Sequence, residues 1–140
     1  MKFTALTLTT TAVLLLAGPL SAHHGDAGRF EETTTTITGT VIALQLVNPH
    51  SVILVSVEDE SGSKVTWQAE MGGPQQLNRN FGWTRNTLKA GDQIAVTGRV
   101  VKSGAPHINL TERARIVLLA SCEEIYVTRS EPDEPLDCTS

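Results

Sequence analysis

Four histidines are the residues of this sequence with the most distinctive chemistry, and two of them, His23 and His24, are adjacent. A third, His50, ends the tripeptide Asn48-Pro49-His50. Imidazole and amine nitrogens bind Cu(II) more tightly than Ni(II) or Zn(II) in the usual affinity order. The α-amine and the ring of an N-terminal His23 would chelate one metal ion together, and His24 or His50 would add a further nitrogen. We therefore predict a Cu(II) site made by His23, His24 and His50.

The segment before the paired histidines has the pattern of a cleavable signal peptide. Lys2 supplies the positive start, residues 5–18 form an uncharged apolar stretch, and Ser21-Ala22 provides the small residues that signal peptidase accepts. We expect cleavage after Ala22, which leaves His23 as the first residue, and export to the periplasm or the medium. Cleavage after Ser21 would place a histidine third, and that terminus also binds Cu(II), through its amine, two amides and an imidazole.

The apolar stretch of the leader is shorter than a membrane-spanning helix requires, and no second stretch of this kind follows it. No cysteine lies near the cleavage site to accept a lipid. We therefore expect the mature chain to have no stable insertion in the membrane.

Each histidine also has an interpretation without a folded metal site. His23 and His24 would then be solvated terminal residues that bind copper only as any such peptide does. His50 would only stabilise its turn, because asparagine forms local hydrogen bonds and proline fixes the backbone. The fourth histidine, His107, follows a Gly-Ala-Pro stretch, and we expect it to be a loop residue outside the site.

The residues after the leader have the pattern of a small β-protein. β-Branched and apolar segments predict five strands and a short sixth one, and Pro74–Arg79 fits a short helix. The order of three strands, a helix and two strands is that of the OB-fold. We predict a mainly β, OB-like barrel of five or six strands, with one short helix between the third and fourth. The predicted strands are Thr33–Val47, Ser51–Val57, Lys64–Met71, Gln93–Val101, Ile108–Leu118 and Glu124–Thr128.

The third of these segments alternates apolar and polar residues, so its two faces have different roles. Trp67 falls on the apolar face and is expected in the core, and Trp83 is expected to cap one end of the barrel. Glu70 falls on the opposite face. An exposed Glu70 would be an ordinary surface acid, whereas in a groove it would ligate a metal or orient a histidine ligand. The second half of the first strand is nearly continuous apolar, which predicts that it is covered on both faces.

The last part of the sequence carries both cysteines, Cys122 and Cys138. In an oxidising compartment we expect a disulfide between them, worth about 3 kcal/mol for a loop of about 15 residues on the chain-entropy model. Six of the fifteen acids lie in the last eighteen residues. The predicted organisation is a signal peptide (1–22), an N-terminal segment (23–32), the barrel (33–118) and an acidic, disulfide-bonded tail (119–140).

Charge and motifs argue against several functions. Without Lys2, ten Lys and Arg face fifteen Asp and Glu, a net charge of about −5, and only five aromatic residues follow the leader. Single-stranded nucleic acids need a basic groove with stacking aromatics, so we expect no nucleic-acid partner. No phosphate-binding loop, nucleophile elbow or zinc-protease motif occurs, and we expect the protein not to be an enzyme.

Several motifs stand in an order that resembles a family of small exported proteins of Gram-negative bacteria, catalogued as a domain of unknown function. They are Ala-His-His after a leader, "TGTV" in a threonine-rich strand, Asn-Pro-His, "WQAE", and "GWTRNTLKAGDQIAVTG". The resemblance covers roughly Ala22 to Val101, and the cysteine-containing end departs from it. It implies that two histidine motifs belong together, so that one metal could join them.

Two functions follow as alternatives. The first is a small periplasmic copper protein that buffers the ion or passes it on. The second is a non-catalytic OB-like module without metal, which binds a small ligand, a peptide or another envelope protein.

Overall fold

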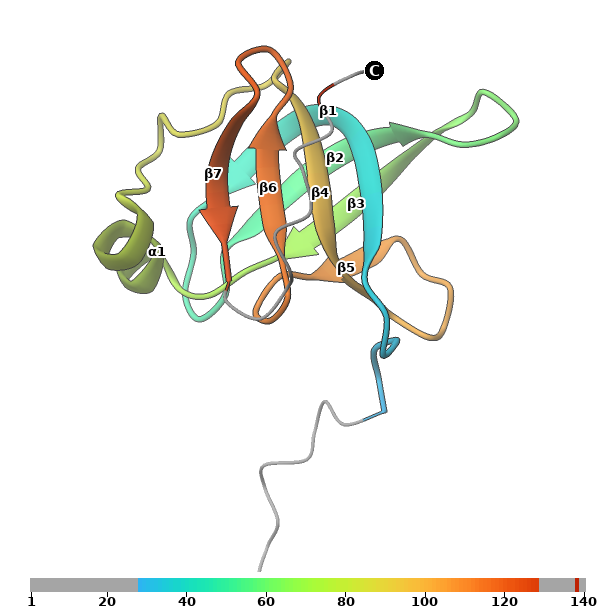
Figure 1. The fold of residues 1–140 in the computed structure, drawn as a ribbon, viewed down its shortest axis with the longest axis horizontal. Helices are drawn as coiled ribbons and strands as arrows, with labels where there is room; N and C mark the ends of the chain where they lie inside the picture. Colours follow the sequence, from blue (N-terminus) through green and yellow to red (C-terminus); the bar gives the residue numbers. More distant parts are fainter. Residues whose placement is uncertain (1–27, 129–137, 139–140) are drawn as a thin grey trace, which may run out of the picture.

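The computed structural model describes residues 28–128 and Cys138. These residues form one sheet in the order β1-β2-β3-β5-β4-β6-β7, and pairing of β1 with β4 closes its first five strands into a barrel (Figure 1). The elements are β1 (Thr35–Gln45), β2 (Val52–Glu58), β3 (Lys64–Glu70), α1 (Pro74–Phe81), β4 (Gln93–Val100), β5 (His107–Asn109), β6 (Arg115–Leu118) and β7 (Glu123–Val127).

The strand order of the barrel confirms the predicted OB-like fold. β1, β2 and β3 form an antiparallel meander, and β4 returns to pair with β1. β3 and β5 pair in parallel, which closes the barrel on its other side. The helix lies between β3 and β4, as predicted, and extends two residues beyond the expected Arg79.

The prediction of one strand from Ile108 to Leu118 is wrong, because the chain leaves the sheet in the middle of this segment. β5 pairs with the end of β4 and β6 with its beginning, so both lie on the same side of β4. Between them the side chain of Asn109 accepts hydrogen bonds from Thr111, and Arg113 has a φ of 50°. Local hydrogen bonds of this kind compete with sheet pairing. They split the predicted strand in two.

The barrel interior is filled by aliphatic side chains that alternate along the strands. Trp83 is 2% exposed and Trp67 packs partly buried against this core, as predicted. The prediction that the end of β1 is covered on both faces is wrong, since Ile42 is 43% exposed. The register between β1 and β2 shifts between Val41 and Ala43, and a bulge at this point turns Ile42 outward.

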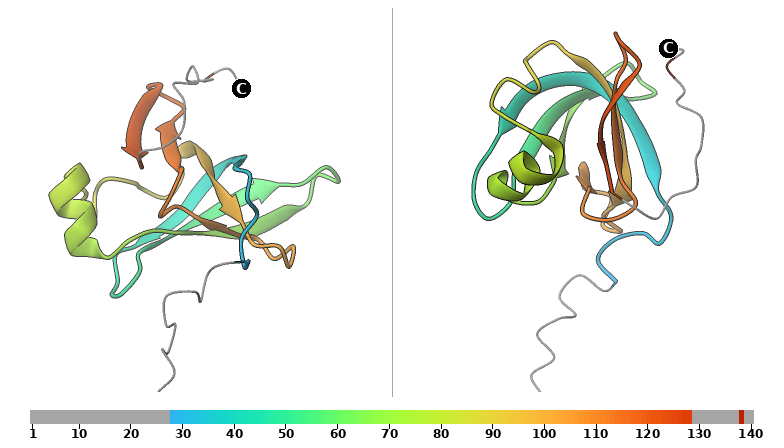
Figure 2. Two further views of the ribbon diagram at one scale, coloured as in Figure 1. Left: turned by 60° about the horizontal axis from the view of Figure 1, so that its bottom comes forward. Right: turned by 60° about the vertical axis from the view of Figure 1, so that its left-hand side comes forward.

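The helix and the last hairpin close one side of the barrel (Figure 2). Pro74 begins α1, and Gly82 ends it with a left-handed φ of 70°. The indole Nε1 of Trp83 donates a 2.9 Å hydrogen bond to the carbonyl oxygen of Ile125 in β7. Tyr126, also in β7, packs its ring against Phe81 and Trp83. Aromatic contacts therefore join the helical link to the strand that follows the barrel.

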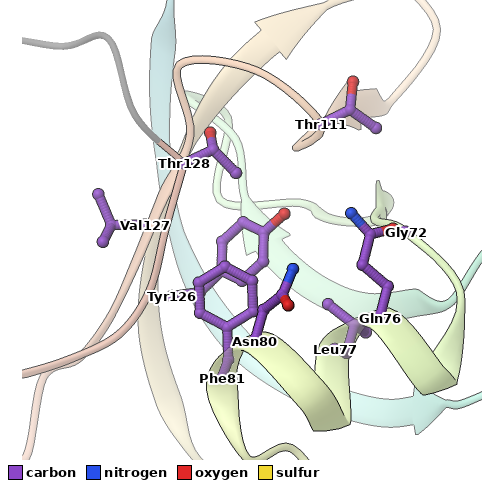
Figure 3. A pocket seen from close by; sticks show the side chains of 9 residues that line it. All are labelled: Gly72, Gln76, Leu77, Asn80, Phe81, Thr111, Tyr126, Val127 and Thr128. Atoms are coloured by element: carbon purple, nitrogen blue, oxygen red, sulfur yellow. The ribbon is translucent and has the colours of Figure 1, made fainter.

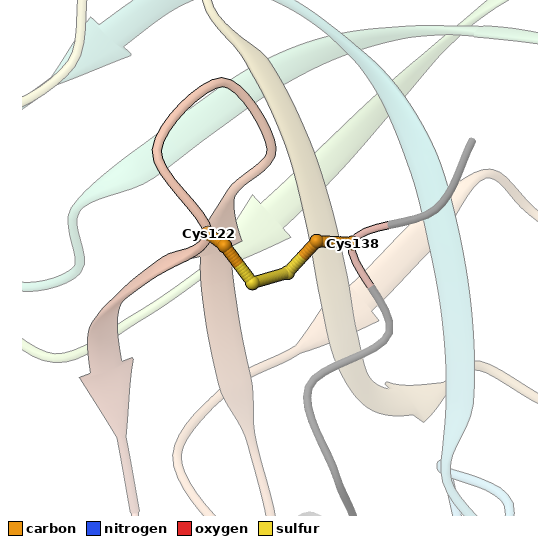
Figure 4. Close-up of a disulfide and its surroundings, with 2 residues drawn as sticks. All are labelled: Cys122 and Cys138. Atoms are coloured by element: carbon orange, nitrogen blue, oxygen red, sulfur yellow. A yellow bond between two sulfur atoms is a disulfide. The ribbon is translucent and has the colours of Figure 1, made fainter.

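The predicted disulfide is confirmed. Cys122, in the turn between β6 and β7, is bonded to Cys138 with a Cα–Cα distance of 5.6 Å (Figure 4). This distance is within the ordinary range for a disulfide. Within residues 28–128, no helix has the length and apolar character needed to cross a membrane.

Candidate functional site

Glu70 lies between two histidines. Its Oε1 is 2.7 Å from Nδ1 of His50, and its Oε2 is 3.2 Å from Nε2 of His107. The Glu70 side chain is 22% exposed, compared with 56% for His50 and 17% for His107. One carboxylate therefore joins an exposed and a mostly buried imidazole, and we call these three residues the His-Glu-His cluster.

Sheet pairing brings the cluster together. Glu70 is the last residue of β3, between Val52 of β2 and Asn109 of β5. His107 begins β5, opposite Gln68 of β3. Alternate residues of a strand share a face, and paired residues on neighbouring strands point to the same side of the sheet. The side chains of Gln68, Glu70 and His107 therefore lie on one face.

His50 comes to Glu70 from the turn before β2. The next residue, Ser51, accepts a backbone hydrogen bond from Met71 and donates one to Gly72. These two bonds hold the turn against the end of β3. The Asn48–Pro49 peptide bond in this turn is cis. The Asn-Pro-His motif thus presents its histidine to the carboxylate.

His107 differs from the prediction of a loop histidine, because it is a strand residue with a buried ring nitrogen. Nε2 has no hydrogen-bond partner among the described residues, although Oε2 of Glu70 is 3.2 Å away. The contact between Nε2 and Oε2 is therefore an ion pair. This ion pair with Glu70 is the polar contact that offsets the burial of Nε2.

The first described residues reach the barrel beside His107. Phe30 forms a bridge with Val101, and the centres of the Phe30 and His107 rings are 6.1 Å apart. The guanidinium groups of Arg29 and Arg99 lie 5.2 and 5.8 Å from the centre of the Phe30 ring. Cation–π contacts of this kind stabilise the position of Phe30. The N-terminal side of the chain is thus anchored next to the cluster.

A pocket of about 410 Å³ opens at this point, between Gly28, Lys102 and His107. His23 and His24 lie outside the described residues, so their predicted role stays a prediction.

The chemistry of the cluster is that of a carboxylate that orients imidazoles. Metal-binding histidines usually donate their second ring nitrogen to such a carboxylate, and metal-binding carboxylates are hydrogen-bonded in turn. Within residues 28–128 and 138, no three histidine, cysteine, aspartate or glutamate side chains are arranged to hold a metal ion. In the cluster, each carboxylate oxygen faces a different ring.

The structure brings Glu70 into contact with His50, and it adds His107 as a second neighbour of Glu70. Glu70 lies against His50, one of the predicted histidine ligands. Its predicted role toward a metal stays a prediction. His107 was missed as a neighbour of Glu70. Its contact depends on the parallel pairing of β3 with β5, two segments more than thirty positions apart in the sequence. Pairing of distant strands leaves no pattern in a single sequence.

A second concave feature lies between α1, β7 and the segment that joins β5 to β6 (Figure 3). This pocket has a volume of about 550 Å³. Gln76 and Asn80 extend from the helix into the space below Thr111, and the rings of Phe81 and Tyr126 form its floor (Figure 3). Amides, hydroxyls and aromatic rings together suit a small polar ligand better than an apolar one.

Comparisons with known proteins identify a family. No curated protein and no solved structure matches the chain. Residues 12–109 match the model described as "Family of unknown function (DUF6152)". The matched span contains all three residues of the His-Glu-His cluster and ends at the last residue of β5, before β6, β7 and Cys122. The match covers more than half of the sequence, so the chain belongs to this family of unknown function.

Proposed function

We propose that this protein is an exported, periplasmic copper-binding protein whose site is shared between the N-terminus and the His-Glu-His cluster. His23 and His24 supply nitrogen ligands from the N-terminus, and His50 belongs to the part of the site on the barrel. The protein buffers Cu(II) or passes it on, and it has no catalytic role.

The observation that carries this proposal is the position of Glu70 between two imidazoles, next to the anchored N-terminal segment. His50 takes part in one of two ways. In the first, Nε2 of His50 binds the metal and Glu70 orients the ring through its contact with Nδ1. In the second, His50 positions the carboxylate of Glu70, and this carboxylate binds the metal. In both cases His50 adds affinity that a free N-terminal peptide lacks.

The types of ligand atom in the proposed site favour copper as the bound metal. Imidazole and amine nitrogens with one carboxylate suit divalent copper, nickel and zinc, and copper binds most tightly in the affinity order. The disulfide between Cys122 and Cys138 is compatible with an oxidising compartment such as the periplasm.

The test is to purify the protein after export and to determine its N-terminus from the intact mass. Native mass spectrometry and chelator competition then measure Cu(II) binding to the protein, to a peptide with the same N-terminus, and to His50→Ala. We expect one Cu(II) per chain, bound more tightly than by the peptide, and weaker binding by His50→Ala. Equal affinity for protein and peptide would contradict the proposal.

The control for His50→Ala is Asn86→Ala, because Asn86 is an exposed residue of the segment after α1. This variant should bind Cu(II) as the unmodified protein does. A loss of affinity in both variants would show a general effect of substitution and would remove the support for His50.

The alternative function is a non-catalytic binding module without metal, and the pocket beside α1 supports it. Gln76 and Asn80 would donate and accept hydrogen bonds from a small polar ligand or an envelope partner. A Gln76→Ala, Asn80→Ala double variant would then lose the ligand, and removal of the histidines would have no effect on binding. Screening the exported protein against small polar compounds by thermal shift tests this alternative.

A further inference from the structure

The pocket between Gly28, Lys102 and His107 has walls that backbone hydrogen bonds hold in place. The N–H of Lys102 donates a 3.0 Å hydrogen bond to the carbonyl oxygen of Arg29, and the N–H of Val101 donates one of 3.2 Å to that of His107. These bonds join the first described residues, the segment after β4 and the start of β5 around one concavity of about 410 Å³. A cavity of this size is within the range of sites for small molecules.

Two basic side chains next to the pocket have acidic partners. The guanidinium of Arg99 lies 3.5 Å from the carboxylate of Glu112, and the ring of His107 lies 3.2 Å from that of Glu70. Neither acid lines the pocket, and no other acid among the described residues does so. Both carboxylates therefore already have a basic neighbour outside the cavity.

Two further basic side chains, Arg29 and Lys102, line the pocket itself. Neither has an acid within ion-pair distance in the part of the chain that the structure describes. The guanidinium of Arg29 lies 5.2 Å from the centre of the Phe30 ring, and this cation–π contact stabilises its position. The pocket thus carries two positive charges, although the whole chain has a net charge of −4. A concavity lined by charges of one sign concentrates ions of the opposite sign.

The remaining lining residues supply an apolar wall and a hydroxyl group. Val101, which is 6% exposed, and Ala105 contribute apolar surface, and Ser103 contributes the hydroxyl. An inorganic anion would contact the cations and leave the apolar wall in water. An apolar body attached to the anion would cover this wall and add affinity.

We propose that this pocket binds a small organic oxyanion, a phosphate monoester or a carboxylate on an apolar body, through the side chains of Arg29 and Lys102. A phosphate monoester has a charge of about −1.5 to −2 at pH 7, so it matches the two cations more closely than a monocarboxylate does. The inference goes beyond the proposed function and does not depend on it, because neither Arg29 nor Lys102 belongs to the proposed copper site.

The first experiment is isothermal titration calorimetry of the metal-free, exported full-length protein with four probes. They are phenyl phosphate, benzoate, inorganic phosphate and the uncharged benzyl alcohol. We expect phenyl phosphate to bind most tightly, benzoate and inorganic phosphate to bind more weakly, and benzyl alcohol not to bind. Tighter binding of benzoate than of phenyl phosphate would identify the ligand as a carboxylate. No binding of either organic anion, or equally tight binding of benzyl alcohol, would overturn the inference.

The second experiment repeats the phenyl phosphate titration on variants. We expect Lys102→Gln and Arg29→Gln each to weaken binding roughly 10-fold, as the loss of one hydrogen bond to a charged group does. Lys89→Gln is the matched control, because it removes the same charge from an exposed lysine before the start of β4, whereas Lys102 follows the end of that strand. Unchanged affinity in both pocket variants, or an equal loss in Lys89→Gln, would overturn the inference.

The third experiment needs no substitution, so it stays decisive if a variant fails to fold. NMR of the backbone amides, with and without phenyl phosphate, locates the bound anion. We expect the amide signals of Lys102, Ser103 and Ala105 to shift and those of Gln76 and Asn80, in the pocket beside α1, to stay unchanged. Shifts confined to Gln76, Asn80 and their neighbours would overturn the assignment to this pocket.

Discussion

Nδ1 of His50 lies 2.7 Å from Oε1 of Glu70, so the turn before β2 and the last residue of β3 meet through their side chains. The same carboxylate reaches His107 on β5. A single acid thus links three chain segments at the point where the N-terminal side of the chain is anchored. Its removal affects every part of the proposed site at once.

We predict that Glu70→Gln lowers the affinity for Cu(II) by at least roughly 10-fold, because an amide is a weaker ligand and a weaker acceptor than a carboxylate. Chelator competition measures the change. Glu112→Gln is the control, since Glu112 is a 70% exposed acid whose partner, Arg99, lies outside the cluster. Equal affinities in the two variants would exclude Glu70 from the site.

The chain has a single tyrosine, so tyrosinate absorbance reports on Tyr126 alone. Burial raises the pKa of Tyr126 from 10.0 to about 12, and its hydroxyl donates a 2.7 Å hydrogen bond to the carbonyl oxygen of Leu110. The ultraviolet titration of the folded protein should therefore have its midpoint well above that of the protein in urea. Coincident midpoints would contradict the buried position of this ring.

The raised pKa of Tyr126 also predicts how stability depends on pH. The folded state holds the neutral hydroxyl, so its contribution is complete below pH 10 and is lost as the pH rises toward 12. Urea unfolding at a series of alkaline pH values should show this decline. Tyr126→Phe, which has no ionisable group at this position, should show a smaller one.

Reduction of the disulfide should lower the free energy of unfolding by up to about 3 kcal/mol without a change in Cu(II) affinity. Cys122 lies in the turn between β6 and β7, at the end of the hairpin opposite β5 (Figure 1). Urea unfolding and chelator competition on Cys122→Ser, Cys138→Ser protein measure the two quantities. A large loss of copper affinity would place the tail in the metal site, against this prediction.

Gly98→Ala should destabilise the barrel by about 1–3 kcal/mol, as overpacking does. A Cβ atom at this position would lie 2.6 Å from the backbone oxygen of Asn109, so β4 and β5 would have to separate. Because His107 is carried by β5, we expect Cu(II) affinity to fall as well. Thr97→Ala is the comparison, since it removes only an exposed hydrogen bond to Thr36. Urea unfolding of both variants checks the difference.

Much of the fold was predictable because it depends on local pattern. Alternation in Lys64–Met71 predicted β3 and its core face, and Pro74 predicted the start of α1. The cysteine pair predicted the disulfide. The interruption between β5 and β6 was not predicted, although the alternation has one exception there, Glu112 at a position on the apolar side. Its cause is a set of side-chain contacts, such as the hydrogen bonds of Asn109 to Thr111, that form only in the folded chain.

The candidate site, like the fold, was predictable in part. Residue type singled out His23, His24 and His50, because the sequence has only four histidines and imidazole is a common metal ligand. The alternation of the third strand singled out Glu70. Only the tertiary structure decided that His107 lies beside Glu70. Parallel pairing of β3 with β5 joins positions far apart in the sequence, and the periodicity of each strand contains no information about its partner. The sequence by itself determined which groups are available for chemistry, and strand pairing determined which of them meet.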